Sequence, residues 1–464
     1  MSFTVQDKAA GEDEEQPAPS TLSVSEVSTR YLRRIITAAS EYLGKTVTSA
    51  VITIPTNFGD KQREALTKAA NDAGVEVLQF ISEPVASILA YDARPEATVE
   101  DKIVVVADLG GTRSDIAVVA SRSGMYTLLS TVHDYEFAGA HLDQVLMDHF
   151  AKDFMKQHNV DPREKPRSLA KLKAEAEATK KALSKSNNAN FSVESLAEGF
   201  DFSVTINRLR YEMLGRKVFE GFNRLIEGAI KKAGLDVLDI DEVILAGGTG
   251  HTPRIATNLA SIFPETTTIL APATSATAIN PSELSVRGAA LQASLVQEFE
   301  ASDIEQSTHP AVTTVKHIAN SIGVLTVGAG GEEVFTPIVA PETAVPARRT
   351  IQFPVPKDGG DVLIKVVEGN THIKVTQPEP KAKPEKSSDD EDDSDFDSDD
   401  DEEEEKREKE WKIRATLAEA ALKGTKKGGK VEVTVNVQAD LGVTVAIREV
   451  GEKGGVRGTV KGSA

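Results

Sequence analysis

The stretch Val104 to Val119, VVVADLGGTRSDIAVV, decides the fold of this chain. Its apolar run ends at Asp108, two glycines follow, and a second alternating run begins after Asp115. This pattern predicts a strand, a tight turn and a return strand. Because glycine has no Cβ, Gly110 and Gly111 let backbone N–H groups approach an anion, and a carboxylate at a strand end can hold hydrated Mg²⁺. The stretch is typical of a nucleotide site, although a plain glycine hairpin with a surface aspartate fits the same letters.

Length and composition exclude several classes of protein. The chain has 464 residues, more than one hydrophobic core usually organises, so two or more units are expected. It has no cysteine, which excludes disulfides and thiolate metal sites or nucleophiles. No apolar run approaches the roughly 20 residues of a membrane helix, and residues 1–20 lack a signal-peptide pattern. We therefore predict a cytoplasmic protein with no membrane partner.

The formal net charge of −19 is concentrated in one acidic tract. Residues 389–405 contain 14 carboxylates, so the rest of the chain carries a net charge of −5. So many like charges cannot collapse, which favours a solvating linker; a binder of histones or other basic proteins is the alternative. We expect no direct DNA binding. Serines among the acids are predicted targets of an acid-directed kinase, namely Ser387, Ser388, Ser394 and Ser398.

The chain is predicted to divide into five segments. Over residues 21–300, strand-like runs alternate with helical patterns and glycine turns follow strand ends, as in an open α/β domain. Beyond it, short alternating runs separated by Gly and Pro predict strands. The segments are a disordered leader (1–20), a partial nucleotide-binding domain (21–300), a β domain (307–377), an acidic disordered linker (378–410) and a second part of the β domain with a tail (411–464).

Several elements can be placed from local patterns. A capping box at residues 23–26, followed by apolar residues at helical spacing, predicts a long helix that ends at Gly44. One long helix is predicted over 209–233, and a short helix over 411–422. A hairpin is expected over 431–450, so the β domain is predicted to resume after the acidic tract.

Five stretches occur in a fixed order over residues 21–297. They are AVITIPTNFGDKQREALTKAANDAGVEVLQFISEPVASILAY (50–91), VVVADLGGTRSDIAVV (104–119), EATKKALS (177–184), ILAGGTGHTPRI (244–255) and NPSELSVRGAALQASL (280–295). Together they resemble the DnaK-type heat shock protein 70 family. The GGTRSD variant, the long charged helix and the acid-interrupted C-terminal part most resemble the ribosome-associated branch of that family, which pairs with a J-protein of the zuotin type.

The resemblance implies a fold, a cofactor and a set of contacts. The implied fold class is α/β: an actin-like (ribonuclease H-like) two-lobed nucleotide-binding domain lacking its first segment, followed by a small, interrupted β-sandwich-like domain. The implied cofactor is ATP with Mg²⁺, between glycine turns, with Asp108 holding the metal through water. The residues implied to contact the nucleotide are Glu83, Asp108, Gly110, Gly111, Thr112, Arg113, Gly139, Glu177, Lys180, Ser184, Gly247, Gly248 and Thr249.

The resemblance also implies individual roles. Glu83 and Asp108 match the carboxylates near Mg²⁺ and the attacking water, while Glu177, Lys180 and Ser184 match residues that hold the adenosine. Judged alone, Glu177 and Lys180 on a charged helix are more typical of a solvated pair. Their occurrence together with two glycine turns favours the nucleotide site.

The chain departs from the family pattern at the phosphate side. Thr112 stands at a third glycine, and Arg113 replaces the threonine that points at the terminal phosphate. An arginine can pair with phosphate but cannot supply that hydroxyl, and its bulk crowds the turn. Ala-Gly-Ala at 138–140 replaces paired glycines and an acid, and His251 replaces an adenine-stacking arginine and is expected to be structural or to face solvent.

The opening phosphate turn of the family and its catalytic lysine have no match in this sequence, so the first segment of the fold is expected to be absent. Phosphoryl transfer depends on several parts acting together. We therefore predict no catalytic residue and no ATP hydrolysis, and leave open whether ATP binds.

The leading hypothesis is a catalytically degenerate chaperone subunit of a ribosome-associated complex. Its expected partners are a J-protein of the zuotin type, the ribosome with its nascent chains, and a conventional partner chaperone. A working chaperone ATPase that uses Glu83, Asp108 and Asp115 is one alternative, and an acidic-tract binder is another. A sugar kinase or filament former of the actin fold is disfavoured by the EPVASILAY helix and the β region. We expect no independent peptide binding by that β region.

Overall fold

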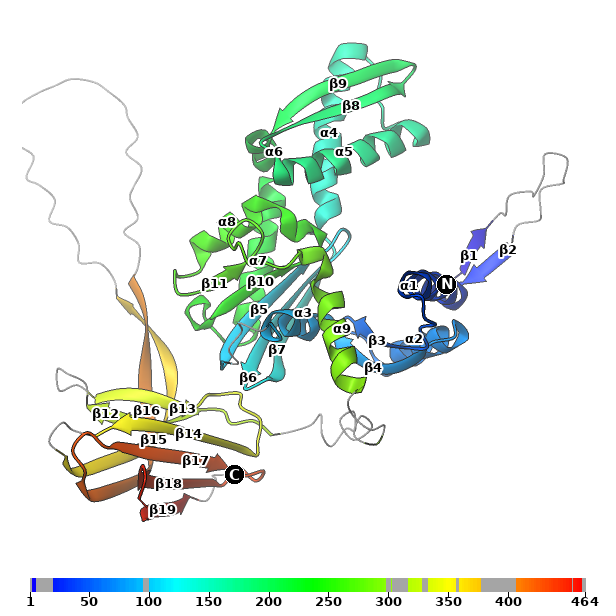
Figure 1. Ribbon diagram of the computed structural model, residues 1–464. Coiled ribbons are helices and arrows are strands. Elements are labelled where there is room, and N and C mark those ends of the chain that lie inside the picture. Colours follow the sequence, from blue (N-terminus) through cyan, green and yellow to red (C-terminus); the bar gives the residue numbers. More distant parts are fainter. Residues whose placement is uncertain are drawn as a thin grey trace, which may run out of the picture. The chain divides into compact units, whose positions relative to one another are not determined.

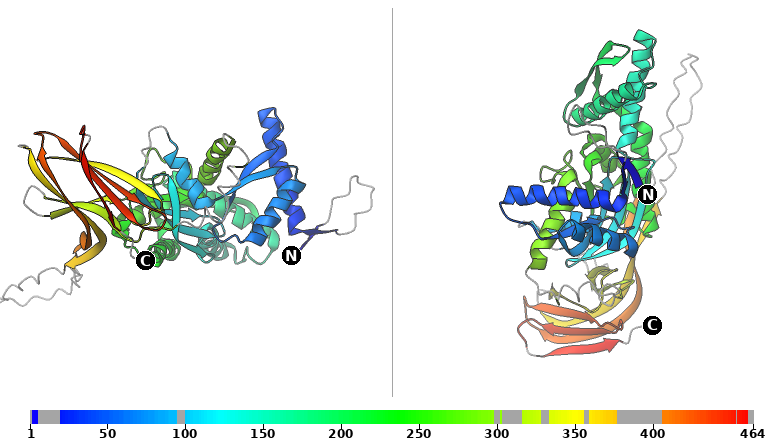
Figure 2. Two further views of the ribbon diagram at one scale, coloured as in Figure 1. Left: turned by 90° about the horizontal axis from the view of Figure 1, so that it is seen from below. Right: turned by 90° about the vertical axis from the view of Figure 1, so that its right-hand side faces the viewer.

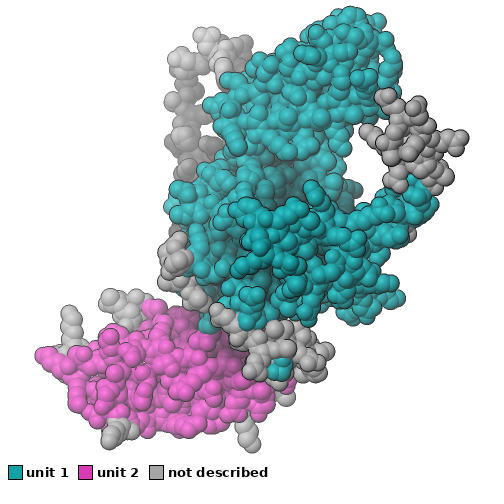
Figure 3. Space-filling model, turned by 45° about the vertical axis from the view of Figure 1, so that its right-hand side comes forward, with its two compact units in different colours: residues 1–313 teal, residues 314–464 magenta. Residues whose placement is uncertain are grey.

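The computed structural model describes residues 2–5, 20–94, 100–297, 302, 316–327, 333–355, 359–376, 406–452 and 454–460. The chain forms two compact units, residues 1–313 and 314–464, which are coloured separately in Figure 3. The predicted phosphorylation sites and the whole of tract 389–405 lie outside the described residues. Among the helices that are described, none has the length and apolar character needed to cross a membrane.

The first unit opens with a capped helix. Helix α1 (Val24–Leu43) begins at the predicted capping box, because the Ser23 hydroxyl accepts from the Glu26 N–H and the Glu26 carboxylate accepts from the Ser23 N–H. Before it, β1 (Ser2–Val5) pairs antiparallel with β2 (Ser20–Ser23). The prediction of a disordered leader is wrong for these residues, because strands of this length are too short to show a period; residues 6–19 lie outside the description.

A small parallel sheet follows, made of β3 (Ser49–Ile54) and β4 (Glu76–Ser82) and joined through α2 (Asp60–Asp72). Within the described residues, β3 pairs with β4 alone, so its other edge has no strand beside it. An apolar groove of about 220 Å³ runs along β3 between α1, α2 and α9. This sheet is therefore only partly covered.

The centre of the unit is a five-stranded sheet of order β11-β10-β5-β6-β7 (Figure 1). Alternate residues of β5 face opposite cores: Val105 and Ala107 pack with α4, α7 and α8, whereas Val104 and Val106 pack with α3 and α9. Burial on both faces explains why the sequence of β5 is continuously apolar. The strands are β5 (Lys102–Leu109), β6 (Ser114–Arg122), β7 (Met125–Asp134), β10 (Glu242–Ala246) and β11 (Thr268–Leu270).

Helices cover this sheet, and a hairpin lies beside α4 and α5 (Figure 1). The single helix predicted over 209–233 is two helices that meet at Gly215, where a Cβ would lie 2.9 Å from the Phe219 ring and 3.1 Å from Leu142. The helices are α3 (Glu83–Asp92), α4 (Gly139–His158), α5 (Pro166–Lys185), α6 (Arg208–Leu214), α7 (Arg216–Lys232), α8 (Pro253–Ile262) and α9 (Leu284–Gln297), and the hairpin is β8 (Asn188–Ala197) with β9 (Phe200–Asn207).

The second unit has two antiparallel four-stranded sheets, of order β13-β12-β15-β16 and β14-β17-β18-β19, around one apolar core (Figure 2). Strands from both sides of the acidic tract pair with each other, as β15 with β16 and β14 with β17. The strands are β12 (Ser321–Val327), β13 (Glu333–Val339), β14 (Ala347–Pro354), β15 (Gly360–Thr376), β16 (Lys406–Thr425), β17 (Lys430–Val437), β18 (Val443–Glu449) and β19 (Gly455–Val460).

The helix predicted over 411–422 is wrong, because these residues lie within β16. Their Ala, Leu and Glu content favours a helix locally, but pairing with β15 along the whole strand overrides that weak preference. The same strand corrects the predicted linker 378–410, since residues 406–410 are already paired. The hairpin predicted over 431–450 is confirmed by β17 and β18.

Candidate functional site

The glycine turn between β5 and β6 is tightly closed. The Gly110 N–H donates to the Arg113 carbonyl at 2.9 Å, and a Cβ on Gly110 would lie 2.7 Å from that oxygen. A side chain at Gly110 would therefore break the turn. The tip, Gly111 and Thr112, is exposed, and a Cβ on Gly111 would meet nothing within 4 Å. The predicted strand, turn and return strand are confirmed.

Two neighbouring elements hold the turn in place. The first N–H groups of α4 donate to it, from Gly139 to the Gly110 carbonyl at 3.0 Å and from Ala140 to the Gly111 carbonyl at 2.7 Å. The Thr249 hydroxyl also donates to the Gly110 carbonyl, at 2.9 Å. Glycine is favoured at position 139, because a Cβ would lie 2.5 Å from the Thr249 hydroxyl and 3.2 Å from the Gly110 carbonyl. These helix amides are therefore engaged by protein carbonyls.

The second glycine turn follows β10 and lies against the end of β5. Gly247 has a φ of 78°, and a Cβ there would lie 2.4 Å from the Leu109 carbonyl and 2.5 Å from Asp108 Oδ1. Both the positive φ and the close approach favour glycine. Gly248 is exposed. His251 hydrogen bonds through Nε2 to Asn280 at 3.0 Å, in line with the structural role expected for it.

On α5, Lys180 reaches the site from the side of the helix. Its ammonium lies 2.7 Å from an Asp143 oxygen and donates to the Gly139 carbonyl at 3.1 Å. Both side chains of the ion pair are largely buried, at 12% and 10% exposed. Burial raises the pKa of Asp143, and the hydrogen bond from Lys180 opposes that rise. Lys180 therefore fastens α5 to the start of α4, next to the glycine turn.

The other predicted residues of α5 make different contacts. The Glu177 carboxylate lies 2.7 Å from the Lys181 ammonium one turn along the helix. The hydrogen bond from Lys181 lowers the pKa of Glu177. The Ser184 hydroxyl donates to the Lys180 carbonyl at 3.4 Å. Glu177, Lys180 and Ser184 share one helix face by their spacing, but of the three only Lys180 has a described contact with the turn region.

Three carboxylates gather where α3, β5 and β6 meet. Asp108 and Asp115 are directly paired in the β5–β6 register, and Glu83 lies in the first turn of α3. Together with Thr56 they line a cavity of about 10 Å³, which has room for about one water molecule. Burial, then the charges of Asp108 and Asp115, raises the pKa of Glu83 to about 7. Burial, then Asp115, raises the pKa of Asp108 to about 6.

The Arg113 side chain turns toward these carboxylates. Its Nε donates to Asp115 Oδ2 at 2.6 Å, and its Nη2 lies 2.5 Å from the same oxygen and 4.0 Å from Glu83 Oε2. The other oxygen of Asp115, Oδ1, lies 2.5 Å from His133 Nδ1. Both carboxylate oxygens of Asp115 are therefore engaged, and Arg113 lowers the pKa of Glu83 and of Asp108 against the effect of burial.

The site includes groups that the motifs did not indicate. The motifs indicate Asp115 only as part of the alternative enzyme, although Arg113 and Asp115 are two residues apart, a spacing that puts side chains on the same side of an extended chain. His133 faces Asp115 through the β6–β7 register, which no local pattern reveals. Thr56 and Asp143 come from separate elements and carry no sequence signal of their own.

The fit of a metal can be tested on these contacts. Among the described residues, no three His, Asp or Glu side chains converge as metal ligands. Mg²⁺ needs oxygen ligands in near-octahedral geometry and keeps several waters. Asp115 is engaged by Arg113 and His133, and the cavity beside Asp108 has room for about one water. These residues fit Mg²⁺ poorly, and the metal contact of Asp108 stays a prediction.

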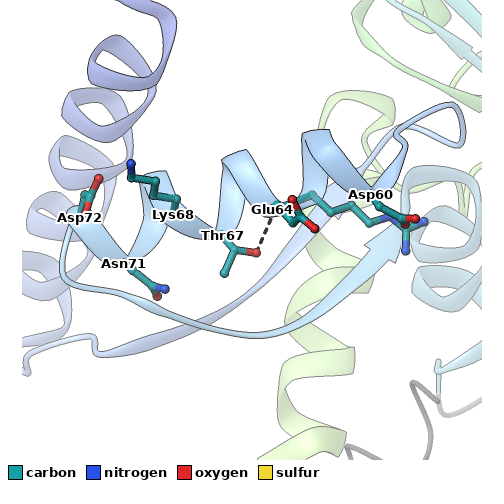
Figure 4. A pocket seen from close by; sticks show the side chains of 7 residues that line it. Asp60, Glu64, Thr67, Lys68, Asn71 and Asp72 are labelled. Carbon is teal, nitrogen blue, oxygen red and sulfur yellow. Dashed lines mark hydrogen bonds between the residues drawn. The ribbon is translucent and has the colours of Figure 1, made fainter.

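A wide depression of about 710 Å³ lies elsewhere, along α2 (Figure 4). Its labelled side chains come from this one helix and carry both signs of charge. The dashed line in the figure is the Thr67 hydroxyl donating to the Arg63 carbonyl at 2.9 Å. The depression shares no lining residue with the carboxylate cavity. Although it is larger, we therefore assign it no role in the chemistry of the glycine turn.

Comparisons with known proteins place the chain in a family. The family model described as Hsp70 protein matches residues 1–383. The ribosome-associated complex subunit SSZ1 of Saccharomyces cerevisiae is 43% identical over 353 residues, which cover 76% of this chain and 64% of that protein. A heat shock protein 70 homologue of Schizosaccharomyces pombe is 42% identical over 381 residues, covering 82% and 65%.

The heat shock cognate 70 kDa protein 3 of Dictyostelium discoideum is 32% identical over 351 residues, covering 75% of this chain and 53% of that protein. The chain thus spans less than two thirds of the length of these relatives. The predicted fold class is confirmed, with an actin-like α/β domain followed by a β-rich domain. The chain belongs to the heat shock protein 70 family.

Proposed function

We propose that this chain is a chaperone subunit of a ribosome-associated complex that does not hydrolyse ATP. The observation that carries the proposal is the position of Arg113, whose guanidinium pairs with Asp115 and approaches Glu83. The family pattern places at this position a threonine that faces the terminal phosphate. A side chain directed into the carboxylates leaves that phosphate without its hydroxyl partner.

The proposal assigns a bound ATP to the exposed tip of the glycine turn. ATP, when bound, supplies a phosphoanhydride whose cleavage needs a positioned water and neutralised charge. The α4 amides that approach the turn already donate to Gly110 and Gly111. The turn residues Gly111, Thr112 and Gly248 are exposed and would face the nucleotide, and Glu177, Lys180 and Ser184 would lie toward the adenosine. In this proposal the chain holds ATP as a structural ligand.

The printed name of one relative supports the proposed association with ribosomes. The Saccharomyces cerevisiae protein is named a subunit of a ribosome-associated complex. This similarity supports a location of the present chain in the cytoplasm, at the ribosome. Its partners in the proposal are a J-protein of the zuotin type and a conventional partner chaperone, which together receive nascent chains. The chain acts there as a scaffold, and its role needs no turnover of its own.

Sedimentation tests the association. Tagged full-length chain, expressed with and without the J-protein, is separated on sucrose gradients beside ribosomes. We expect the chain to move with ribosomes when the J-protein is present and to stay near the top without it. Dissociating the ribosomes with EDTA should shift the J-protein and the chain together. A chain that stays at the top in both extracts would contradict the proposal.

A second candidate, a working ATPase, is favoured by one observation. Glu83 has its pKa raised to about 7 and lines a cavity with room for about one water, as a general base near neutral pH requires. If the chain is an ATPase, Glu83→Gln should remove turnover while the exposed Glu220→Gln leaves it unchanged. Equal phosphate release by both variants and by buffer would exclude this candidate.

A further inference from the structure

We propose that the guanidinium of Arg113 takes the place of a divalent cation among Glu83, Asp108 and Asp115, so that this site carries its own positive charge and binds no Mg²⁺. The inference rests on the proposed function in one respect, that the turn is a nucleotide site. The inference goes beyond the proposed function, because a chain that does not hydrolyse ATP could still balance these carboxylates with either Mg²⁺ or an arginine.

The carboxylates need a positive charge close to them. Asp108 and Asp115 stand opposite each other across the hairpin, and like charges in that position destabilise a sheet. Glu83 lines the same small cavity. In water each group would be ionised at neutral pH, but partial burial of three neighbouring carboxylates makes ionisation of all three unfavourable without a cation.

Arg113 supplies that charge from the turn itself. Two of its nitrogens, Nε and Nη2, approach Asp115 Oδ2 at 2.6 and 2.5 Å, and Nη2 is 4.0 Å from Glu83 Oε2. The side chain is only 23% exposed, so its charge stays within the site. A guanidinium is permanently charged and suits carboxylates through its planar set of N–H groups. The contact is therefore a fixed part of the site.

Arg113 and its neighbours also take up the ligands and the space that a metal would use. Asp115 contacts Arg113 through one oxygen and His133 through the other, so neither is available to a metal without breaking a contact. Mg²⁺ usually keeps several waters, whereas the cavity of about 10 Å³ accommodates about one. Both the engaged ligands and the small volume therefore argue against a bound Mg²⁺ at this site.

The test measures Mn²⁺ binding to the full-length chain by electron paramagnetic resonance of the free ion. Because the acidic tract also attracts cations, binding at the site is taken as the difference between each protein and the same protein carrying Asp108→Asn. We expect no such difference in the wild type. In Arg113→Thr, which removes the guanidinium, we expect saturable Asp108-dependent binding to appear, at least tenfold tighter than in the same chain that also carries Asp108→Asn.

A matched control removes an arginine charge elsewhere. Arg216 is 80% exposed and pairs with Glu220 on the surface, so Arg216→Thr should bind Mn²⁺ as the wild type does. Saturable Asp108-dependent binding by the wild type would overturn the inference. So would an Arg113→Thr chain that binds no tighter than Arg216→Thr.

If Arg113→Thr does not fold, the comparison of Mn²⁺ binding between the wild type and Asp108→Asn tests the inference by itself. The assay contains no ATP and follows no turnover, so its failure is distinct from failure of the proposed function. Wild-type Mn²⁺ binding would refute the inference and leave the chaperone role untouched, whereas loss of ribosome association would do the reverse.

Discussion

The two sheets of the first unit differ in how completely they are enclosed. In the five-stranded sheet, Val104 and Val105 are 0% exposed, because helices cover both faces. In the β3–β4 sheet, five of the six residues of β3 are only partly buried, and the groove of about 220 Å³ runs beside it. The glycine turn depends on the enclosed sheet: its contacts with α4 and with Thr249 lie within residues 100–297. The turn can therefore keep its shape while the neighbouring sheet stays partly open.

The largest expected effect comes from a substitution in the core beneath the enclosed five-stranded sheet. Phe150 is 0% exposed and stacks on Phe191 with ring centroids 4.0 Å apart, in the same core as β5. Phe150→Ala should lower the free energy of unfolding by about 3–5 kcal/mol, through lost burial and the cavity left behind. The loss is measured by chemical denaturation followed by helical circular dichroism, which reports the first unit because the described part of the second is all β.

Phe200 provides the control for that change. Its side chain is 44% exposed, so Phe200→Ala should cost less than about 1 kcal/mol. Equal losses from the two phenylalanines would mean that α4 and the β8–β9 hairpin do not form the enclosed core described above.

A pH series tests the carboxylates at the turn. The folded-state pKa of Asp108 is raised to about 6 from 3.8, mainly by burial. Between these values the folded chain holds the proton and the unfolded chain does not, so this group makes stability fall as pH rises from about 4 to about 6. Asp108→Asn removes that effect. From pH 4 to pH 7 the variant should gain roughly 2–3 kcal/mol relative to the wild type.

Denaturation midpoints at several pH values, compared between Asp108→Asn and the wild type, provide the measurement. Asp60→Asn is a suitable control at an exposed aspartate on α2. A stability difference between Asp108→Asn and the wild type that does not change with pH would contradict the burial of Asp108 in the cluster.

The smallest expected effect comes from the same substitution, valine to alanine, made once in each sheet. Val118 in β6 is 0% exposed, whereas Val51 in β3 is partly exposed and lines the groove. Removing two methyl groups should cost about 2 kcal/mol at Val118 and about 1 kcal/mol or less at Val51. Unfolding free energies of Val118→Ala and Val51→Ala give the comparison directly. A larger loss at Val51 would show that β3 is better enclosed than its neighbours indicate.

The enclosed sheet is also the part that the sequence predicts best. An apolar run followed by two glycines and a second apolar run predicts β5, the turn and β6. The signal is strong because strands that are buried on both faces are continuously apolar. Strand β16 was missed because its conformation comes from pairing with β15, and its Ala and Leu residues favour a helix locally. Long-range pairing therefore limits what local patterns can reveal.

The candidate site shows the same limit. The glycines at 110 and 247 were found because a tight turn or close backbone approach leaves a composition signal. The motifs do not predict the direction of Arg113, although it contacts Asp115 two residues later, and residues two apart face the same side of an extended chain. The contact of Asp115 with His133 depends on strand register, which is set by the whole sheet.

The most direct test of the account is a single-turnover assay. Full-length chain in excess over labelled ATP, with MgCl₂ present, is sampled for labelled phosphate over hours. Because Arg113 occupies the carboxylate cluster, we expect release at the rate of protein-free buffer, and the same rate from Asp108→Asn. Release well above buffer that Asp108→Asn abolishes would contradict the claim that this site binds without hydrolysing.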